Sequence, residues 1–145
     1  MELNKFSMTI PSNSCNESFA RVTVAAFASR LDPTLEEIAD IKTSVSEAVT
    51  NCSVHAYPDT IGKIYITCEI INDNMVKIKI RDKGCGIENV KQAMEPLFTT
   101  GGEERAGLGF AVMESMMDSI KVTSRLNKGT TVIMKKKIRS KEDVR

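Results

Sequence analysis

Residues 63–81, KIYITCEIINDNMVKIKIR, contain two runs in which apolar and polar side chains alternate. The apolar members are Ile64, Ile66, Cys68 and Ile70 in the first run and Val76, Ile78 and Ile80 in the second. A repeat of two residues is typical of a β-strand that buries one face and exposes the other. Asn72, Asp73 and Asn74 separate the runs and favour a tight turn. The stretch therefore predicts an antiparallel hairpin with one solvated face.

Further strands are expected on both sides of this hairpin. Residues 5–10 form a short strand that Pro11 stops, and residues 120–124 and 130–138 form a last hairpin about the turn at residues 127–129. Because the strands occur as hairpins and not as alternating βα units, a doubly wound parallel sheet is excluded.

Apolar residues spaced three or four apart predict the helices. The first helix carries the apolar residues Phe19, Val22, Ala26 and Phe27, and its N-cap candidates are Ser12, Asn13, Ser14 and Asn16. The second begins after Thr34, with Glu37 completing a capping box, and runs to about residue 57. Residues 90–94 and 110–117 are also expected to be helical.

Together these elements predict an α+β two-layer sandwich, with helices on one face of a mixed, mostly antiparallel sheet. We expect a single domain of residues 1–138, followed by a charged, flexible tail of residues 139–145.

The overall composition is that of an ordinary soluble protein. Of 145 residues, 41% are hydrophobic and 27% are charged, and 20 Lys and Arg nearly balance 19 Asp and Glu. This balance gives no reason to expect a polyanion partner held by bulk charge, so direct nucleic-acid binding is not expected. The N-terminus lacks the apolar region of a signal peptide, and no apolar run approaches the roughly 20 residues of a membrane span. We expect a cytoplasmic protein that does not enter a membrane.

The cysteines do not form a metal site. Cys15, Cys52, Cys68 and Cys85 include no C-x-x-C pair, and His55 is the single histidine. These residues do not supply the ligands of a structural zinc. They are expected to be reduced thiols in a reducing cytosol.

Glycines gather in three small clusters between residues 82 and 109. They are Gly84 with Gly86, Gly101 with Gly102, and Gly107 with Gly109. The chain has no G-x-x-x-x-G-K-[ST] loop and no G-x-G-x-x-G between a strand and a helix. Glycine lets backbone amides converge on an anion, so three clusters beside a Thr-rich loop favour phosphate binding over simple surface turns.

The second predicted helix has a polar side opposite its Ile and Val face. Its members are Asp40, Ser44, Glu47, Asn51 and His55. A solvated helix face is the simple interpretation. However, residues 43–57 contain no Lys or Arg, which indicates that this side faces a cavity.

Four short motifs, in this order, resemble those of the Bergerat-fold ATPase and kinase superfamily. Glu47-Ala48-Val49-Thr50-Asn51 resembles its N-box, Asp82-Lys83-Gly84-Cys85-Gly86 its D-x-G-x-G box, Gly107-Leu108-Gly109-Phe110 its second glycine box and Gly129-Thr130 its final one. Each motif is weak alone, and the set in order is specific. With the string EAVTNCSVHAY at residues 47–57, the chain is similar over its full length to the anti-sigma serine kinases of Gram-positive bacteria.

The resemblance implies an ATP site with Mg²⁺. Asn51 would bind the nucleotide and be the protein ligand of magnesium, and Glu47 would accept or orient a proton of the attacking hydroxyl. Asp82 would accept from the adenine amino group, with Gly84 and Gly86 closing on the base and Thr130 near the adenine end. Gly107, Leu108 and Gly109 would open the helix at residue 110, whose N-terminal amides suit the triphosphate.

The resemblance also implies a lid over the phosphates at residues 96–106. Thr99, Thr100 and Gly101 would contact the nucleotide there. Arg105 would pair with the γ-phosphate as a catalytic residue or meet an acidic partner, and an ordinary solvated charge stays open. His55 would contact a phosphate or be satisfied by its neighbours at the helix end.

The implied function couples two activities. With ATP bound, a homodimer would capture a sigma factor, and Arg21 and Arg30 are candidate contacts for it. A small anti-anti-sigma protein would receive the γ-phosphoryl group on a serine. Two alternatives remain: a non-catalytic ATP-gated binding module, and a detached catalytic domain of a histidine kinase, which would have to act in trans because no second histidine occurs in the chain.

Overall fold

The computed structural model describes residues 4–94 and 102–139, except for the side chains of residues 102–107. The strands are β1 (Lys5–Pro11), β2 (Lys63–Ile71), β3 (Met75–Asp82), β4 (Ser119–Arg125) and β5 (Gly129–Lys137). The helices are α1 (Asn16–Ala28), α2 (Leu35–Asn51), α3 (Val90–Ala93) and α4 (Gly102–Met116), with a 3-10 turn η1 (Ser29–Leu31) and a π-helical turn η2 (Cys52–Ala56).

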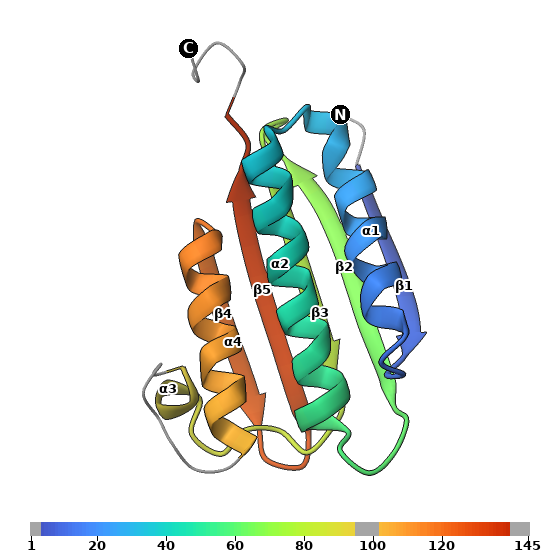
Figure 1. Cartoon of the computed structure of the whole chain (residues 1–145), viewed down its shortest axis with the longest axis vertical. Coiled ribbons are helices and arrows are strands. Elements are labelled where there is room, and N and C mark those ends of the chain that lie inside the picture. The colour runs from blue at the N-terminus through green and yellow to red at the C-terminus, as the bar shows by residue number, and fades with distance from the viewer. Residues whose placement is uncertain (1–3, 95–101, 140–145) are drawn as a thin grey trace.

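The strands form one sheet in the order β1-β2-β3-β5-β4, and every pairing is antiparallel. Figure 1 shows α1, α2 and α4 side by side on the same face of this sheet. The predicted two-layer sandwich is confirmed, and its sheet is wholly antiparallel where a mixed one was allowed.

The β2–β3 hairpin follows the alternation that predicted it. Its turn residues Asn72 and Asp73 both have positive φ, 54° and 61°, as the tight turns that match strand twist require. The alternate apolar residues are buried, with Ile66 paired to Ile80 and Cys68 to Ile78. The hairpin therefore places the core on its helix-facing side.

The core lies between the sheet and the three long helices. Its largest fully buried side chains are Phe110, Met113, Met134, Ile41, Ile64, Ile66, Ile78, Ile80, Val24, Val45, Val49 and Val76. Helix α2 contributes Ile41, Val45 and Val49, in line with its predicted stripe. Burial of such side chains stabilises a fold by about 1.5–3 kcal/mol each.

Helix α1 differs from its prediction at both its start and its buried face. The N-cap is Cys15, without a side-chain cap. The proposed capping side chains are engaged elsewhere: Asn13 accepts from the Cys15 N–H, and Asn16 donates to the Pro11 carbonyl at 3.0 Å. The buried face is made by Ala20, Val24, Ala25, Phe27 and Ala28.

The remaining predicted apolar positions of α1 point outward. Phe19 is 54% exposed and Val22 56% exposed, so neither belongs to the core. Small alanines take the inner positions because α1 packs closely on α2.

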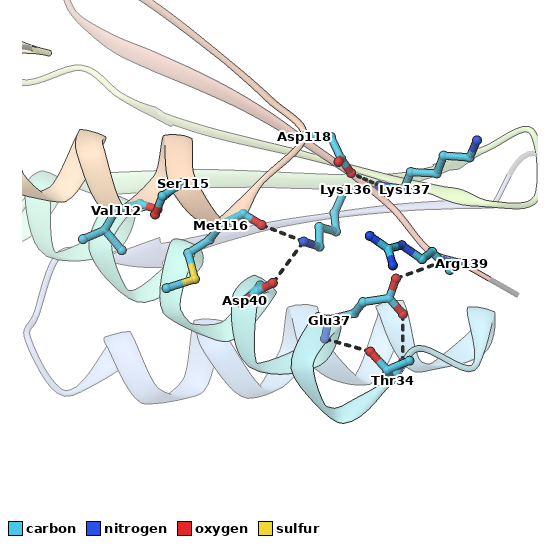
Figure 2. Close-up of polar contacts among 10 residues, drawn as sticks. All are labelled: Thr34, Glu37, Asp40, Val112, Ser115, Met116, Asp118, Lys136, Lys137 and Arg139. Carbon is cyan, nitrogen blue, oxygen red and sulfur yellow. Dashed lines mark hydrogen bonds and ion pairs between the residues drawn. The ribbon is translucent and has the colours of Figure 1, made fainter. Parts of the chain in front are cut away.

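Helix α2 begins with the predicted capping box. Thr34 Oγ1 accepts from the Glu37 N–H at 3.1 Å, and Glu37 Oε1 accepts from the Thr34 N–H at 2.9 Å. Figure 2 shows that Glu37 also holds the chain just after β5, because its Oε2 accepts from the Arg139 N–H at 2.9 Å. One buried carboxylate thus fixes the start of α2 against the end of the sheet.

Helix α4 begins eight residues earlier than the predicted start at residue 110. Glycine costs only about 1 kcal/mol in a helix interior, and Glu103, Glu104 and Ala106 are residues that favour a first helical turn. Packing of Phe110 and Met113 in the core adds to that preference. Gly107 and Gly109 therefore lie inside the helix, and the prediction that they precede its N-terminus is wrong.

Candidate functional site

A hollow opens where the end of α2 meets β3, β5 and α4. It is lined by Ala48, Asn51, Cys52, His55, Ala56, Ile80, Asp82, Gly86, Ile87, Phe110, Thr130 and Val132. It contains about 410 Å³ of atom-free space, counting the open space at its mouth. Its walls are mostly apolar with a few polar groups, which is the usual lining of a small-molecule site.

Asp82 is the buried carboxylate of this hollow, with 5% of its surface exposed. Its Oδ1 accepts from the Gly84 N–H at 2.9 Å and from the Thr130 N–H at 3.2 Å. Its Oδ2 lies 3.6 Å from the Cys52 sulfur. Burial raises the pKa of Asp82 above its ordinary value, and the hydrogen bonds from Gly84, Thr130 and Cys52 lower it in part.

Cys52 is a donor to Asp82 and not a nucleophile. Burial, followed by the Coulombic effect of Asp82, raises the pKa of the Cys52 thiol well above its ordinary value. A thiol held in its protonated form is unreactive and can donate a weak hydrogen bond. It therefore orients Asp82 Oδ2, the carboxylate oxygen that the Gly84 and Thr130 amides do not contact.

Asn51 lies at the last turn of α2 and lines the hollow. Its side-chain nitrogen Nδ2 is buried and has no hydrogen-bond partner. Buried polar atoms are nearly always paired in native proteins, so an orphaned amide in a hollow indicates a missing ligand.

Glu47 lies one turn before Asn51, half-buried at the contact between α2 and α4. A Cβ at Gly109 would lie 3.1 Å from Glu47 Oε2 and 3.4 Å from the Asn51 side chain. Glycine at position 109 therefore lets α4 approach both polar side chains.

The first glycine box is folded against its own chain. Gly86 has φ of +73°, and a side chain there would meet the Arg125 carbonyl. Gly84 lies directly against the Ala56 backbone, and the Cys85 N–H donates to the Ala56 carbonyl at 3.0 Å. These contacts join the box to η2 and to the β4–β5 turn.

Two residues that fix the site were not among the sequence predictions. The Tyr57 hydroxyl accepts from the Lys83 N–H at 2.7 Å and donates to the Lys63 carbonyl at 2.8 Å. Ser124 Oγ accepts from the Ile87 N–H at 2.8 Å, donates to the Gly129 carbonyl and contacts Thr130 Oγ1 at 2.8 Å. Tyr57 ends the string EAVTNCSVHAY but had no predicted role, and Ser124 belongs to no motif.

The π-helical turn η2 was also not predicted. Its closing bond runs from the Tyr57 N–H to the Cys52 carbonyl at 3.1 Å. Such turns are frequent at functional sites. Here it places Cys52, His55 and Ala56 in the wall of the hollow.

The predicted site residues fall into three groups. Asn51, Asp82, Gly86 and Thr130 line the hollow, and Glu47 and Gly109 meet beside it. Gly84 and Leu108 do not line it, and Leu108 is 50% exposed. Thr99, Thr100 and Gly101, the side chain of Arg105 and the surroundings of Gly107 lie outside the described residues.

The residues on the polar side of α2 do not all face the hollow. Asn51 and His55 face the hollow, as predicted. Asp40 instead forms an ion pair with Lys136 at 3.0 Å, and Ser44 is fully buried away from the hollow. The C-terminal residues of that side therefore face this hollow, whereas Asp40 lines a separate hollow at the other end of α2.

The residues of the hollow fit an adenine nucleotide. Asp82 Oδ2 has only the weak thiol contact among the hydrogen bonds of the described residues, so it can accept from an exocyclic amino group. Ile80, Val132 and Phe110 supply apolar walls for a flat ring. Asn51 carries an amide oxygen, a ligand of the kind that hard cations prefer.

Comparison with known proteins agrees with this geometry. The family model of the histidine kinase-like ATPase domain matches residues 11–136. The chain therefore belongs to the histidine kinase-like ATPase domain family.

Its full-length relatives are anti-sigma F factors. The protein of Clostridium acetobutylicum is 55% identical over 97% of this chain and 98% of its own. That of Caldanaerobacter subterraneus subsp. tengcongensis is 57% identical over 93% of this chain and 94% of its own. Within the ATPase family, the chain thus falls among the anti-sigma F factors.

Solved structures share the fold at low identity. The RsbU and RsbW domains of a Mycobacterium tuberculosis protein superpose with a TM-score of 0.68, at 18% identity, over 92% of this chain and 32% of that one. The histidine kinase domain of the Erythrobacter litoralis blue-light activated kinase gives 0.57 at 17% identity, over 89% of this chain and 62% of that one. Within the described residues, no helix is both long and apolar enough to span a membrane.

Proposed function

We propose that this protein binds ATP with Mg²⁺, restrains a sigma factor in the ATP-bound state and phosphorylates a serine of an anti-anti-sigma protein. The main support is the meeting of α2 and α4, where Glu47, Asn51 and Gly109 converge beside the Asp82 hollow. The sigma-factor partner is supported by the name of the full-length relatives.

Asp82 selects adenine in this proposal. Its Oδ1 is held by the Gly84 and Thr130 amides, which leaves Oδ2 as the acceptor for the base amino group. Guanine presents a carbonyl oxygen at that position, which would face a carboxylate without a proton between them. The Cys52 thiol and the Tyr57 hydroxyl keep the carboxylate and the following turn in place.

Asn51 and Glu47 act at the phosphate end. Asn51 contributes its amide oxygen to magnesium, which usually keeps waters and phosphate oxygens as its other ligands. The bound metal neutralises charge on the transferring phosphoryl group. Glu47, one helical turn away, accepts or orients the proton of the attacking serine hydroxyl.

Further predicted residues, most of them outside the described part, complete the proposed site. Thr99, Thr100 and Gly101 would close over the phosphates, with Gly107 and Leu108 at the α4 end. Arg105 would place a guanidinium on the γ-phosphate, a group that binds phosphate in bidentate geometry.

Helix α1 is the proposed contact for protein partners. Phe19 and Val22 are exposed apolar side chains on its outer face, which suits a homodimer or a partner surface. Arg21 lies beside them and is paired to Glu17 at 3.2 Å. Arg30 contacts Asn4 and lies over the Phe27 ring, so it is less available to a sigma factor.

A transfer assay with two variants tests the function. Glu47→Ala is expected to bind Mg-ATP normally and lose phosphoryl transfer, while Glu114→Ala, an exposed carboxylate on α4, is expected to transfer normally. Transfer that persists in Glu47→Ala excludes Glu47 as the base. An acid-stable phosphoserine on the partner supports the proposal, and an acid-labile phosphohistidine supports the histidine-kinase alternative.

A further inference from the structure

The sheet face opposite the helices carries charge of almost one sign. Outward positions alternate with the buried ones along every strand. The cations at these positions are Lys5, Lys63, Lys77, Lys79, Arg81, Lys121, Arg125, Lys135 and Lys137. Glu69 is the acidic residue among the outward positions of the five strands. We call this surface the open face.

The net charge of the chain hides this segregation. The whole sequence has 20 Lys and Arg against 19 Asp and Glu. The described acidic residues lie on the helices and in the connecting segments, apart from Glu69 and the buried Asp82 on the strands. Balanced totals predicted no polyanion partner, but a partner meets one face of a protein and not its total charge.

The cations of the open face are not neutralised within the protein. Across residues 4–94 and 102–139, the ion pairs are Arg21 with Glu17 and Lys136 with Asp40. Lys77 lies directly opposite Lys135 in the β3–β5 register. Like charges at opposed positions destabilise a sheet, and Glu69, opposite Lys77 in the β2–β3 register, offsets part of that cost.

Two hollows on the open face group the cations further. Lys5, Lys77 and Lys79 line one of them, together with Thr67 and Glu69. Arg81, Arg125 and Lys128 line part of the other, where Thr123 and Thr131 add hydroxyl groups and the buried Asp82 is the one acidic residue of the lining. Cations beside hydroxyl donors are the side chains that contact phosphate oxygens.

The composition of the open face disfavours a protein or a membrane. Protein interfaces are depleted in lysine and enriched in aromatic and apolar residues at their centre. The exposed large apolar residues of the described part, among them Phe19, Val22 and Leu35, are not on the sheet strands. Membrane-surface binding likewise needs apolar side chains that enter the lipid.

A single-stranded nucleic acid is also disfavoured. Such ligands stack their bases on a series of exposed rings. Tyr65 is the aromatic residue at the outward strand positions, and Arg81 and Lys83 lie over its ring at 6.0 and 5.0 Å. A double-stranded nucleic acid, in contrast, presents a regular row of phosphates, and its bases need not be unstacked for binding.

We propose that the open face binds the phosphate backbone of double-stranded nucleic acid without reading its sequence. Alternate residues of one strand lie roughly 6.6–6.8 Å apart, so each strand offers cations at regular intervals. The described part of the chain has no helix on this face that could enter a groove, so base edges are not contacted. The proposal is independent of the nucleotide site, which lies on the helix side of the sheet.

Fluorescence anisotropy with a labelled 24-base-pair DNA duplex tests this proposal. Full-length protein is expected to bind at 50 mM salt with a micromolar dissociation constant, and equally to a second duplex of unrelated sequence. If about three phosphates are neutralised, affinity falls roughly 40-fold between 50 and 200 mM salt. Absence of binding at 50 mM salt overturns the proposal.

Neutralising the opposed lysines separates binding from folding. Lys77→Gln with Lys135→Gln is expected to weaken duplex binding about tenfold at 50 mM salt. Its melting temperature should stay close to that of wild type, because the like-charge contact of Lys77 with Lys135 and its opposite-charge contact with Glu69 are both removed. The matched control, Lys42→Gln with Lys91→Gln, removes two exposed cations of the helical layer and is expected to bind within twofold of wild type. The proposal is overturned if both double variants bind the duplex equally more weakly than wild type. It is also overturned if the protein binds phosphatidylserine vesicles more tightly than the duplex, or if poly-glutamate at matched charge displaces the duplex.

Discussion

Glu47 and Gly109 face each other across the contact between α2 and α4, and a Cβ at position 109 would lie 3.1 Å from Glu47 Oε2. Glycine inside a helix is usually a cost of about 1 kcal/mol relative to alanine. Here it keeps the space beside the proposed base and the proposed magnesium ligand free. The missing side chain at Gly109 therefore both lowers the stability of the helix and lets α4 approach Glu47.

A Gly109→Ala variant tests that relationship. Alanine gains helix propensity, so the melting temperature is expected to stay unchanged or rise, while phosphoryl transfer falls at least tenfold because the methyl group crowds Glu47. The exposed α4 substitution Ser115→Ala should leave transfer unchanged. Normal transfer in Gly109→Ala would show that the close approach has no catalytic role.

Asp82 gives the protein a pH-dependent stability. Burial raises its folded-state pKa above the unfolded value of 3.8, so the folded protein binds this proton more tightly than the unfolded chain. Its contribution to stability is complete below the unfolded pKa and is lost as pH rises through the folded pKa. The Asp82→Asn variant should therefore lose less stability than wild type between about pH 4 and pH 7.

Urea unfolding of wild type and Asp82→Asn at several pH values measures this difference. The subtraction of the two curves removes the titration of all other carboxylates. Parallel curves for the two proteins would contradict the raised pKa of Asp82. Asp82→Asn is also expected to bind ATP more weakly, since an amide can present its NH₂ group to the base amino group.

The four thiols should react in two classes. Cys15 and Cys85 are exposed, whereas Cys52 and Cys68 are buried. Burial raises the pKa of the Cys68 thiol to about 12 and that of Cys52 well above its ordinary value. Alkylation at pH 8 followed by mass spectrometry is expected to label Cys15 and Cys85 quickly and the other two only after unfolding. Rapid labelling of Cys52 in the native protein would show that the hollow is not closed around it.

Lys136 joins three elements at the far end of α2, as Figure 2 shows. Its Nζ lies 3.0 Å from Asp40 Oδ2 and donates to the Met116 carbonyl at 2.7 Å, at the end of α4. A Lys136→Met variant leaves a half-buried carboxylate and a helix-end carbonyl without this donor. We expect a loss of about 1–3 kcal/mol in the free energy of unfolding, measured with urea.

Lys137→Met is the matched control, because Lys137 is exposed and only its backbone N–H is engaged, with Asp118 at 2.6 Å. It should change stability by less than about 0.5 kcal/mol. If the two variants are equally stable, Lys136 does not hold α2 and α4 together.

Periodicity predicted the elements whose apolar faces are simple. The β2–β3 hairpin and the capped start of α2 follow directly from alternation, turn residues and the Thr34–Glu37 spacing. The predicted buried face of helix α1 is wrong because the outer face of this helix is as apolar as its inner one. Sequence alone does not say that Phe19 is exposed while Ala20 is buried. The predicted start of helix α4 lies too late in the sequence, because core packing of Phe110 and Met113 outweighs the helix penalty of the local glycines.

The motifs identified the parts of the site but not what holds them. Asn51, Asp82 and Thr130 were expected to meet, and they line one hollow. Tyr57 and Ser124 hold the surroundings of that hollow through hydrogen bonds to backbone groups distant in the sequence, and such contacts leave no pattern in the sequence. The charge of the open face was likewise invisible until the strands were placed side by side, because it depends on register and not on composition.

Calorimetric titration of Mg-ATP into wild-type protein and the Asn51→Ala variant tests the central claim most directly. The account predicts saturable binding by wild type at one site per chain and at least a hundredfold weaker binding by Asn51→Ala, with the Glu114→Ala control unchanged. Wild-type affinity in Asn51→Ala would contradict it, because the Asn51 amide, which lines the Asp82 hollow, would then have no part in holding the nucleotide.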